Sequence, residues 1–292
     1  MKRGESMIVP DWPAPPNIRA AVTTRLFPGE SKPPFDRCNL GTRCGDEPGA
    51  VAANRAALIE ALELPEAPRW MRQVHGIDVY DADAVLADVE PETDAAITRQ
   101  TGRVLAILTA DCLPVFLCTD DGTAVAIAHA GWRGLAGGVV EETVARFGVA
   151  PASLMAWLGP AIGARSYEVG DEVRVAFVDR DENASVAFES TRPGHWHCDL
   201  YALARTRLAA AGVDRVFGGG FDTFADERFY SYRRHRETGR FASLVWIAPA
   251  TVRADAKAHN ADVADGALQP VFARVFGKAR DALASSMALI SP

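Results

Sequence analysis

The chain has 292 residues, of which 48% are hydrophobic and 24% are charged, as in an ordinary globular protein. Its 38 acidic and 31 basic residues give a net charge of −7, which argues against general binding to nucleic acid or to an anionic membrane. The longest apolar run, residues 104–118, is too short for a membrane span and contains Asp111 and Pro114.

The cysteines and the N-terminus indicate a cytoplasmic protein. No apolar segment follows the basic N-terminus, so we expect no secretory signal. The five cysteines show no CxxC spacing, which argues against a disulfide framework and against a zinc finger. We therefore expect reduced thiols at Cys38, Cys44, Cys112, Cys118 and Cys198.

The first third of the chain predicts one helix after a long irregular region. Residues 10–16 contain four prolines and are expected to be extended. Residues 28–49 are rich in Gly, Pro and Asp and predict a long loop, and long loops in compact domains are often functional. A helix is predicted over residues 50–62, ending before Pro65.

The middle of the chain predicts buried strands around a helix. Residues 104–110 and 124–130 are short apolar runs bounded by polar or turn residues, which indicates strands. A helix is predicted over residues 135–147, ending at Gly148, and a strand over residues 153–159. The strand at 124–130, the helix at 135–147 and the strand at 153–159 are predicted to form a βαβ unit.

The later elements alternate in the same way. We predict helices over residues 171–178 and 200–211, strands over 213–220 and 244–248, and a helix over 270–288 within an Ala-rich C-terminal segment.

Two chemically active side chains lie at the ends of predicted strands. Cys112 follows the strand at 104–110, and His129 lies at the end of the strand at 124–130. Ligands bind at the carboxyl ends of strands in open α/β sheets, so we expect adjacent strands to bring these side chains together. The third candidate is His75, in the segment Gln73-Val74-His75-Gly76. It is one of six histidines in the chain.

A cysteine with two histidines has several possible uses. The set matches a catalytic zinc site with an open fourth position. It also matches a copper site if a weak axial ligand is present. Without a metal, the cysteine could act as a nucleophile and a histidine as its base. Taken singly, a cysteine at a buried strand end is more often a small core residue, and a histidine near glycine is more often a structural one.

Two arginines are candidates for binding an anion. Arg133 lies in a Gly-rich turn that leads into the predicted helix, and helix N-termini attract phosphate or carboxylate groups. Arg233 belongs to a second basic segment, and a tight turn or a solvated surface would explain either site equally well. His195 and His197 form an HxH pair, but we expect an exposed loop there.

Several longer motifs resemble one known family. In chain order they are Asn39-Leu40-Gly41 with Gly45-Asp46, Gln73-Val74-His75-Gly76, Thr109-Ala110-Asp111-Cys112-Leu113-Pro114, His129-Ala130-Gly131-Trp132-Arg133-Gly134, Leu158-Gly159-Pro160-Ala161-Ile162-Gly163, Tyr167-Glu168-Val169-Gly170, and Phe229-Tyr230-Ser231-Tyr232-Arg233-Arg234 with Thr238-Gly239-Arg240. This order over about residues 18–248 resembles the bacterial YfiH-like laccase-domain family. Its members are described as purine nucleoside phosphorylases, formerly as polyphenol oxidases, and in some cases as peptidoglycan editing factors.

The resemblance implies a fold and a domain organisation. It implies an α+β fold with mixed β-sheets layered against helices in a single large catalytic domain. We therefore expect an extended lead-in over residues 1–17, a laccase-like metal-dependent domain over residues 18–249, and a helical C-terminal extension of unknown role over residues 250–292.

The resemblance also implies an activity and its residues. It makes His75, Cys112 and His129 the zinc ligands and catalytic residues of an enzyme that converts adenosine, inosine or guanosine and phosphate into base and ribose 1-phosphate. Adenosine deamination and methylthioadenosine phosphorolysis are attributed to the family as well. Within the matching motifs, the candidate substrate-binding residues are Asn39, Gln73, Asp111, Arg133 and Arg233.

Three other functions stay open at this point. The first is a copper-dependent polyphenol oxidase, although six histidines and one HxH pair are few for a multicopper centre. The second is a cytoplasmic amidase that edits peptidoglycan precursors, and the third is a non-catalytic metal-binding protein. In one departure from the family, Asp222-Thr223 stands where a Cys-Thr pair is usual.

Overall fold

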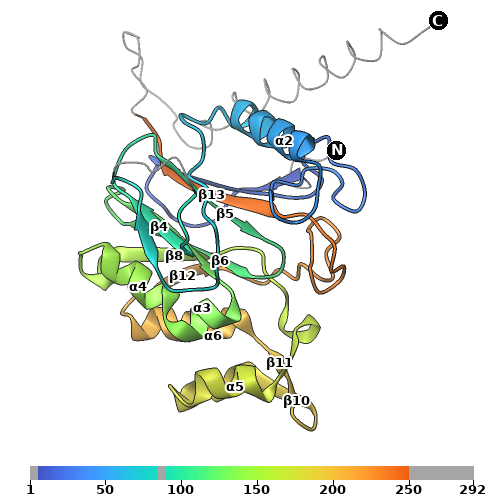
Figure 1. The fold of residues 1–292 in the computed structure, drawn as a ribbon. Helices are drawn as coiled ribbons and strands as arrows, with labels where there is room; N and C mark the ends of the chain where they lie inside the picture. The colour runs from blue at the N-terminus through green and yellow to red at the C-terminus, as the bar shows by residue number, and fades with distance from the viewer. Residues whose placement is uncertain (1–5, 85–89, 250–292) are drawn as a thin grey trace, which may run out of the picture.

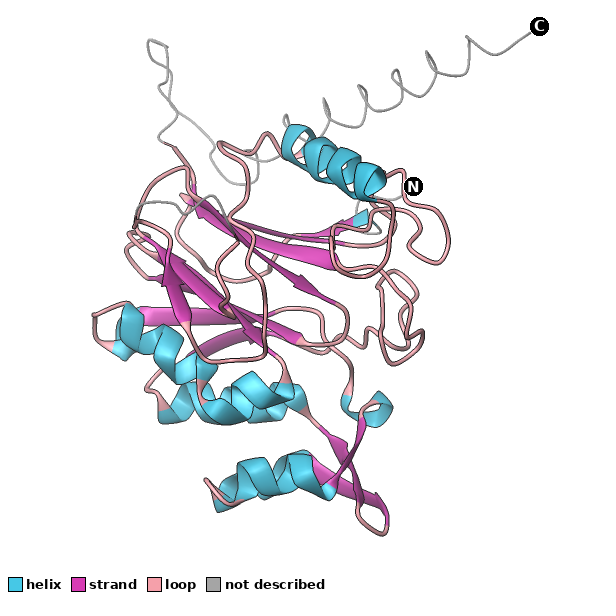
Figure 2. Cartoon of the chain, in the orientation of Figure 1, coloured by secondary structure: helices cyan, strands magenta, loops and turns pink. Residues whose placement is uncertain are grey.

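The computed structural model describes residues 6–84 and 90–249, and these form four layers (Figure 1). One helix covers the outer face of a first sheet, a second sheet packs on the inner face, and further helices cover the second sheet (Figure 2). This arrangement confirms the predicted α+β fold with mixed sheets and helices. No helix in the described part of the chain is both long enough and apolar enough to cross a membrane.

The first sheet is antiparallel and has the strand order β1-β2-β13-β5. Its strands are β1 (Met7–Ile8), β2 (Ile18–Thr23), β13 (Phe241–Ile247) and β5 (Val104–Thr109). The first strand brings the predicted lead-in into the fold, where the Trp157 indole also donates a 2.9 Å hydrogen bond to Asp11.

The second sheet is mixed and has the order β12-β8-β6-β7-β4-β3. Its strands are β12 (Arg215–Gly218), β8 (Leu154–Leu158), β6 (Leu113–Thr119), β7 (Val125–Ala130), β4 (Ala95–Thr98) and β3 (Val79–Asp81). The pairs at its two edges are parallel and the central pairs are antiparallel. A separate antiparallel sheet contains β10 (Phe188–Arg192), β11 (His195–Cys198) and β9 (Glu168–Gly170).

Four of the five described helices lie on the outer faces of the two large sheets, and the fifth, over residues 171–178, packs against the separate small sheet. They are α2 (Pro48–Ala61), α3 (Trp132–Gly137), α4 (Val139–Arg146), α5 (Asp171–Val178) and α6 (Leu200–Ala210), with short 3-10 turns at Pro151–Ser153, Ala164–Ser166 and Glu182–Ala187. In Figure 1, α2 lies over the first sheet, and α3, α4 and α6 lie under the second.

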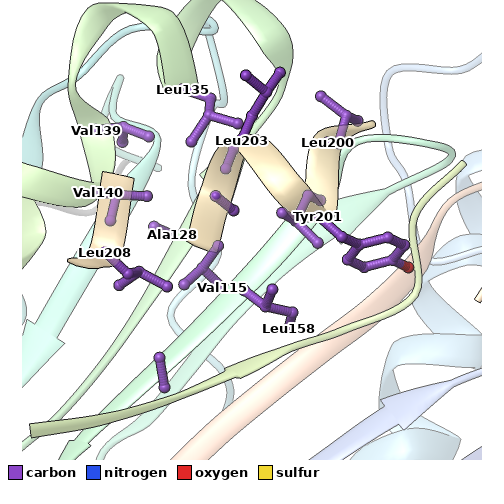
Figure 3. Packing of buried hydrophobic residues seen from close by; sticks show 14 of the residues in the cluster. Val115, Ala128, Leu135, Val139, Val140, Leu158, Leu200, Tyr201, Leu203 and Leu208 are labelled. Carbon is purple, nitrogen blue, oxygen red and sulfur yellow. The ribbon is translucent and has the colours of Figure 1, made fainter. Parts of the chain in front are cut away.

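Alternation along the strands of the second sheet explains why their sequences are almost continuously apolar. In β7, Val125 and Ile127 face the core between the sheets, whereas Ala126 and Ala128 face the helices. Successive strand residues point to opposite faces, so a strand that is covered on both sides needs apolar residues at every position. Figure 3 shows the helical side of this packing, with residues of β6, β7 and β8 against residues of α3, α4 and α6.

Most of the predicted elements are confirmed, and three expectations are corrected. The helix predicted over residues 135–147 is two helices, because Gly138 between them adopts a positive φ of 112°. In the predicted βαβ unit, β7 and β8 share a sheet, but β6 lies between them and is antiparallel to both. The segment with His195 and His197 is strand β11 and not a loop.

The strand β6 is the main omission of the sequence-based prediction. Pro114 lies inside it, and proline is unusual in a central strand because it cannot donate a hydrogen bond. The predicted helix at 270–288 and the C-terminal extension lie outside the described residues.

Candidate metal centre

His75, Cys112 and His129 converge at one place in the structure. Their potential ligand atoms, one from each side chain, all lie within 4.8 Å of one another. The Cys112 Sγ atom is 3.9 Å from His75 Nε2, and the two imidazole rings meet edge to face with centroids 4.8 Å apart. His75 is exposed, Cys112 is half-buried and His129 is buried, so the group opens to solvent on the His75 side.

The pairing of β6 with β7 brings Cys112 to His129. In their antiparallel register Leu113 lies opposite Ala130, so Cys112, just before β6, reaches the end of β7. The expectation that the strands containing residues 104–110 and 124–130 are adjacent is wrong, because β5 and β7 belong to different sheets. The chain crosses between the sheets at Asp111, which adopts a positive φ of 92°.

Asp94 contacts both histidine segments, and the sequence analysis did not single it out. This fully buried residue precedes β4, and its Oδ1 atom lies 2.7 Å from His129 Nδ1. Its carboxylate also accepts hydrogen bonds from three successive backbone N–H groups, those of Val74, His75 and Gly76, at 2.7–3.0 Å. The one sequence signal is an acidic residue directly before an apolar strand, which is too common to be specific.

Gly131 allows the ligand side chains to approach the backbone closely. A Cβ atom at this position would lie 2.8 Å from His75 Cδ2 and 3.1 Å from Cys112 Sγ. Real Cβ atoms essentially never approach another heavy atom as closely as the first of these distances. A residue with a side chain therefore does not fit at position 131, which explains the glycine in the motif His129-Ala130-Gly131.

Cys112, His129 and Asp94 change one another's ionisation, and His75 adds to the effect on Cys112. Burial opposes the ionisation of Cys112, but the positive charge and hydrogen bonding of His129 and His75 outweigh it and lower the thiol pKa to about 6. Burial likewise opposes a charged His129, yet Cys112 and Asp94 raise its pKa to about 9. In the metal-free site these shifts favour a thiolate beside an imidazolium near neutral pH.

Gln73 and Asp111 hold the backbone around this cluster. The Gln73 amide makes two 2.8 Å hydrogen bonds to the backbone of Leu108, which attaches the His75 loop to β5. The Asp111 carboxylate accepts hydrogen bonds from the Thr223 hydroxyl at 2.6 Å and from the Arg233 backbone N–H at 2.7 Å. Through these contacts Asp111 joins the Cys112 turn to the segment that contains Arg233.

Asn39 is engaged inside the long loop over residues 28–49. It is fully buried, and its amide hydrogen-bonds to the backbone of Gly41 and Arg240 and to the side chains of Cys44 and Asp46. Its donor and acceptor are thus both used by the protein. Its predicted contact with substrate, like those of Gln73 and Asp111, stays a prediction.

The two candidate arginines differ in how far the protein already uses them. Arg133 lies in the first turn of α3, and its guanidinium stacks 4.3 Å from the Trp132 ring. Within the described residues that guanidinium makes no hydrogen bond and no ion pair. Arg233 donates from Nη1 to the Glu168 carbonyl at 2.8 Å and lies over the Tyr167 ring.

Asp222, which stands where a cysteine is usual in the family, has a local structural role. Its carboxylate accepts hydrogen bonds from the Gly163 N–H at 3.0 Å and from the Ser166 hydroxyl at 2.6 Å. It therefore supports the turn that precedes Tyr167. The following residue, Thr223, makes the hydrogen bond to Asp111.

The layered sheets and this cluster define an α+β protein with a candidate His-Cys-His metal site. The chain belongs to the laccase-like family described as multi-copper polyphenol oxidoreductase laccase, whose sequence model matches residues 19–248. This membership confirms the resemblance that the motifs indicated.

Curated relatives and solved structures agree with this membership. A protein of Xylella fastidiosa named purine nucleoside phosphorylase is 53% identical over 251 residues, which cover 82% of this chain and 96% of the relative. The purine nucleoside phosphorylase YfiH of Escherichia coli is 48% identical over 246 residues, with coverage of 82% and 98%. The crystal structure of Neisseria meningitidis protein NMB0706 superposes with a TM-score of 0.80 at 44% identity and covers 84% of this chain and all of that one. YlmD from Geobacillus stearothermophilus superposes with a TM-score of 0.76 at 32% identity, with coverage of 85% and 98%.

Proposed function

We propose that this chain is a zinc-dependent purine nucleoside phosphorylase, which converts adenosine, inosine or guanosine and phosphate into the free base and ribose 1-phosphate. The observation that carries the proposal is the convergence of one thiol and two imidazoles in a chain about half identical to proteins that are named for this activity. The proposal places the enzyme in the cytoplasm, where reducing conditions keep Cys112 available as a thiol.

The donor set fits zinc. Thiolate sulfur and imidazole nitrogen are both preferred zinc ligands, and catalytic zinc sites keep three protein ligands and one open position. Among the described residues the group has three such members and no fourth, which also argues against a purely structural site. Zinc bound there would supply a Lewis acid that polarises an oxygen atom of the reactants.

The protein's own part in the reaction is chiefly to position the reactants. In phosphorolysis the ribosyl C1′ atom gains positive charge, and phosphate attacks it as the nucleophile, so both reactants must be held together. Arg133 is our first candidate for holding phosphate, because its guanidinium makes no hydrogen bond or ion pair within the described chain. Arg233 is the second, because part of its hydrogen-bonding capacity goes to Glu168.

The same proposal includes two side activities and a domain assignment. Adenosine deamination and methylthioadenosine phosphorolysis involve substrates with the same purine and a closely similar sugar. We assign the activity to residues 18–249, which almost coincide with the matched range.

The test is an incubation of the zinc-loaded protein with a panel of nucleosides, with and without phosphate. We expect release of hypoxanthine from inosine that depends on phosphate and stops when a chelator removes the metal. Chromatography of the adenosine reaction distinguishes adenine, the phosphorolysis product, from inosine, the deamination product. Release of base at the same rate without phosphate would contradict the proposal.

A copper-dependent phenol oxidase is the second candidate, favoured by the description of the family. A multicopper centre needs more ligands than the described chain brings together, since the group has three members. Purified protein with stoichiometric copper and a strong blue absorption band would reverse this order. The structure adds no specific observation in favour of peptidoglycan editing.

A further inference from the structure

We propose that Asp94 is a positioning residue that holds both histidines of the cluster in the geometry needed to bind a metal. This inference rests on the metal-binding part of the proposed function. One buried carboxylate contacts the ring of His129 and the backbone of His75, so a single residue prepares two ligands that lie 54 positions apart in the chain.

The first effect concerns the ring of His129. The 2.7 Å contact between Asp94 Oδ1 and His129 Nδ1 is a hydrogen bond in which the ring donates to the carboxylate. A histidine that ligates a metal is a neutral imidazole with one proton, so a proton fixed on Nδ1 leaves the lone pair of Nε2 for the metal. A carboxylate behind a histidine ligand both orients the ring and increases its basicity. The backbone supports the contact, because the His129 N–H donates to the Asp94 carbonyl at 2.7 Å.

The second effect concerns the backbone of His75. This residue adopts a positive φ of 61°, which is unfavourable for a residue with a side chain. The three successive N–H groups of residues 74–76 turn inward and converge on the Asp94 carboxylate, as in other backbone concavities that bind anions. The hydrogen bonds to Asp94 thus stabilise the unusual conformation that directs His75 toward Cys112.

Asp94 is chemically suited to both effects because four N–H groups point at it. Both carboxylate oxygens accept, Oδ1 from His129 and from the His75 backbone, and Oδ2 from Val74 and Gly76. An asparagine has the same shape, but it offers one oxygen and places an NH2 group against donors at the other position. The substitution Asp94→Asn therefore removes acceptors from a buried site without changing its volume.

The experiment compares Asp94→Asn with Asp83→Asn. Asp83 is a matched control because its carboxylate also accepts a backbone N–H, that of Arg99, beside the other end of β4. Zinc affinity is measured by competition with a chromophoric chelator, and the cobalt(II) derivatives are compared by their visible spectra. In the metal-free proteins, hydrogen exchange of the amides of residues 74–76 is followed by NMR.

We expect Asp94→Asn to weaken zinc binding by about 10–100-fold, the range for partners behind metal ligands. It should also change the cobalt(II) spectrum and accelerate exchange of the three amides, whereas Asp83→Asn should change none of these. Unchanged zinc affinity and spectrum in Asp94→Asn would overturn the inference, as would an equal loss in the control.

The experiment also gives a result if the variant does not fold or if the wild-type protein binds no zinc. If Asp94→Asn does not fold, the wild-type protein decides, through protected amides at residues 74–76 and a slowly exchanging His129 Nδ1–H signal in the zinc-loaded form. The absence of either would overturn the inference. If wild-type protein binds no zinc, the proposed function fails, and the amide exchange of the metal-free variants decides separately whether Asp94 holds the His75 loop.

Discussion

The Sγ atom of Cys112 lies 3.9 Å from the Nε2 atom of His75, although 37 positions separate the two residues. Zinc–sulfur and zinc–nitrogen bond lengths in a tetrahedral site place such ligand atoms roughly 3.5 Å apart. The pair is therefore close to the separation that one zinc ion would require, without a rearrangement of the backbone.

Replacing this thiol tests the ligand assignment. We expect Cys112→Ala to abolish phosphorolysis and to lose its zinc, because one of three metal ligands is missing. The fold should persist, since the substitution removes little volume. Metal content per chain, thermal unfolding and hypoxanthine release check this. Cys44→Ala, which removes another partly exposed thiol, is the control and should retain its zinc. A Cys112→Ala protein with one equivalent of zinc and normal turnover would refute the assignment.

The pH dependence of thiol alkylation tests the electrostatics of the metal-free site. The thiolate is the reactive form, and the folded protein lowers the pKa of Cys112 from 9.0 to about 6. We expect rapid reaction with iodoacetamide above about pH 6 and a decline as the pH falls through that value. In unfolded protein the decline should come near pH 9 instead. Bound zinc should protect the thiol, and Cys112→Ala gives the background from other cysteines. A midpoint near 9 in the folded protein would contradict the predicted thiolate.

The phosphate dependence of activity in two variants shows which of the candidate arginines binds phosphate. Arginine can hold two phosphate oxygens at once, whereas lysine offers a compact point charge. We expect Arg133→Lys to weaken phosphate binding by about 1–3 kcal/mol and so to raise the phosphate requirement, with a smaller change for the nucleoside. Arg233→Lys is the comparison, measured over the same phosphate titration. If only Arg233→Lys shifts the phosphate dependence, the anion site lies at that residue and Arg133 is structural.

A substitution at Gly131 tests whether His75 and Cys112 need a residue without a side chain beside them. A methyl group there would collide with the His75 ring at 2.8 Å and press on Cys112 Sγ at 3.1 Å. We expect Gly131→Ala to reduce zinc affinity at least tenfold, about 1.4 kcal/mol, because two ligands must move. Gly49→Ala in α2 is the control, because its Cβ would meet no atom closer than 3.8 Å. Equal zinc affinity in the two variants would show that the cluster tolerates the added methyl group.

Local sequence predicted much of the fold for a physical reason. Strands such as β5 and β7 are apolar except at Thr109 and His129 near their ends, because both of their faces are covered, and such short runs are recognisable. Helices α5 and α6 also lie where the sequence places them. Strand β6 was missed because Pro114 breaks the local pattern, whereas its pairing with both neighbours depends on the whole sheet.

The sequence by itself determined which side chains have metal-binding chemistry, since thiol and imidazole groups are identifiable by residue type and their motifs match one family. Tertiary structure alone decided how they meet. Cys112 reaches His129 through the register of β6 on β7, and β5 lies in the other sheet. Asp94 is one of 38 acidic residues in the sequence. It becomes distinctive because folding buries its carboxylate among four N–H groups, a relationship between distant segments that no local pattern encodes.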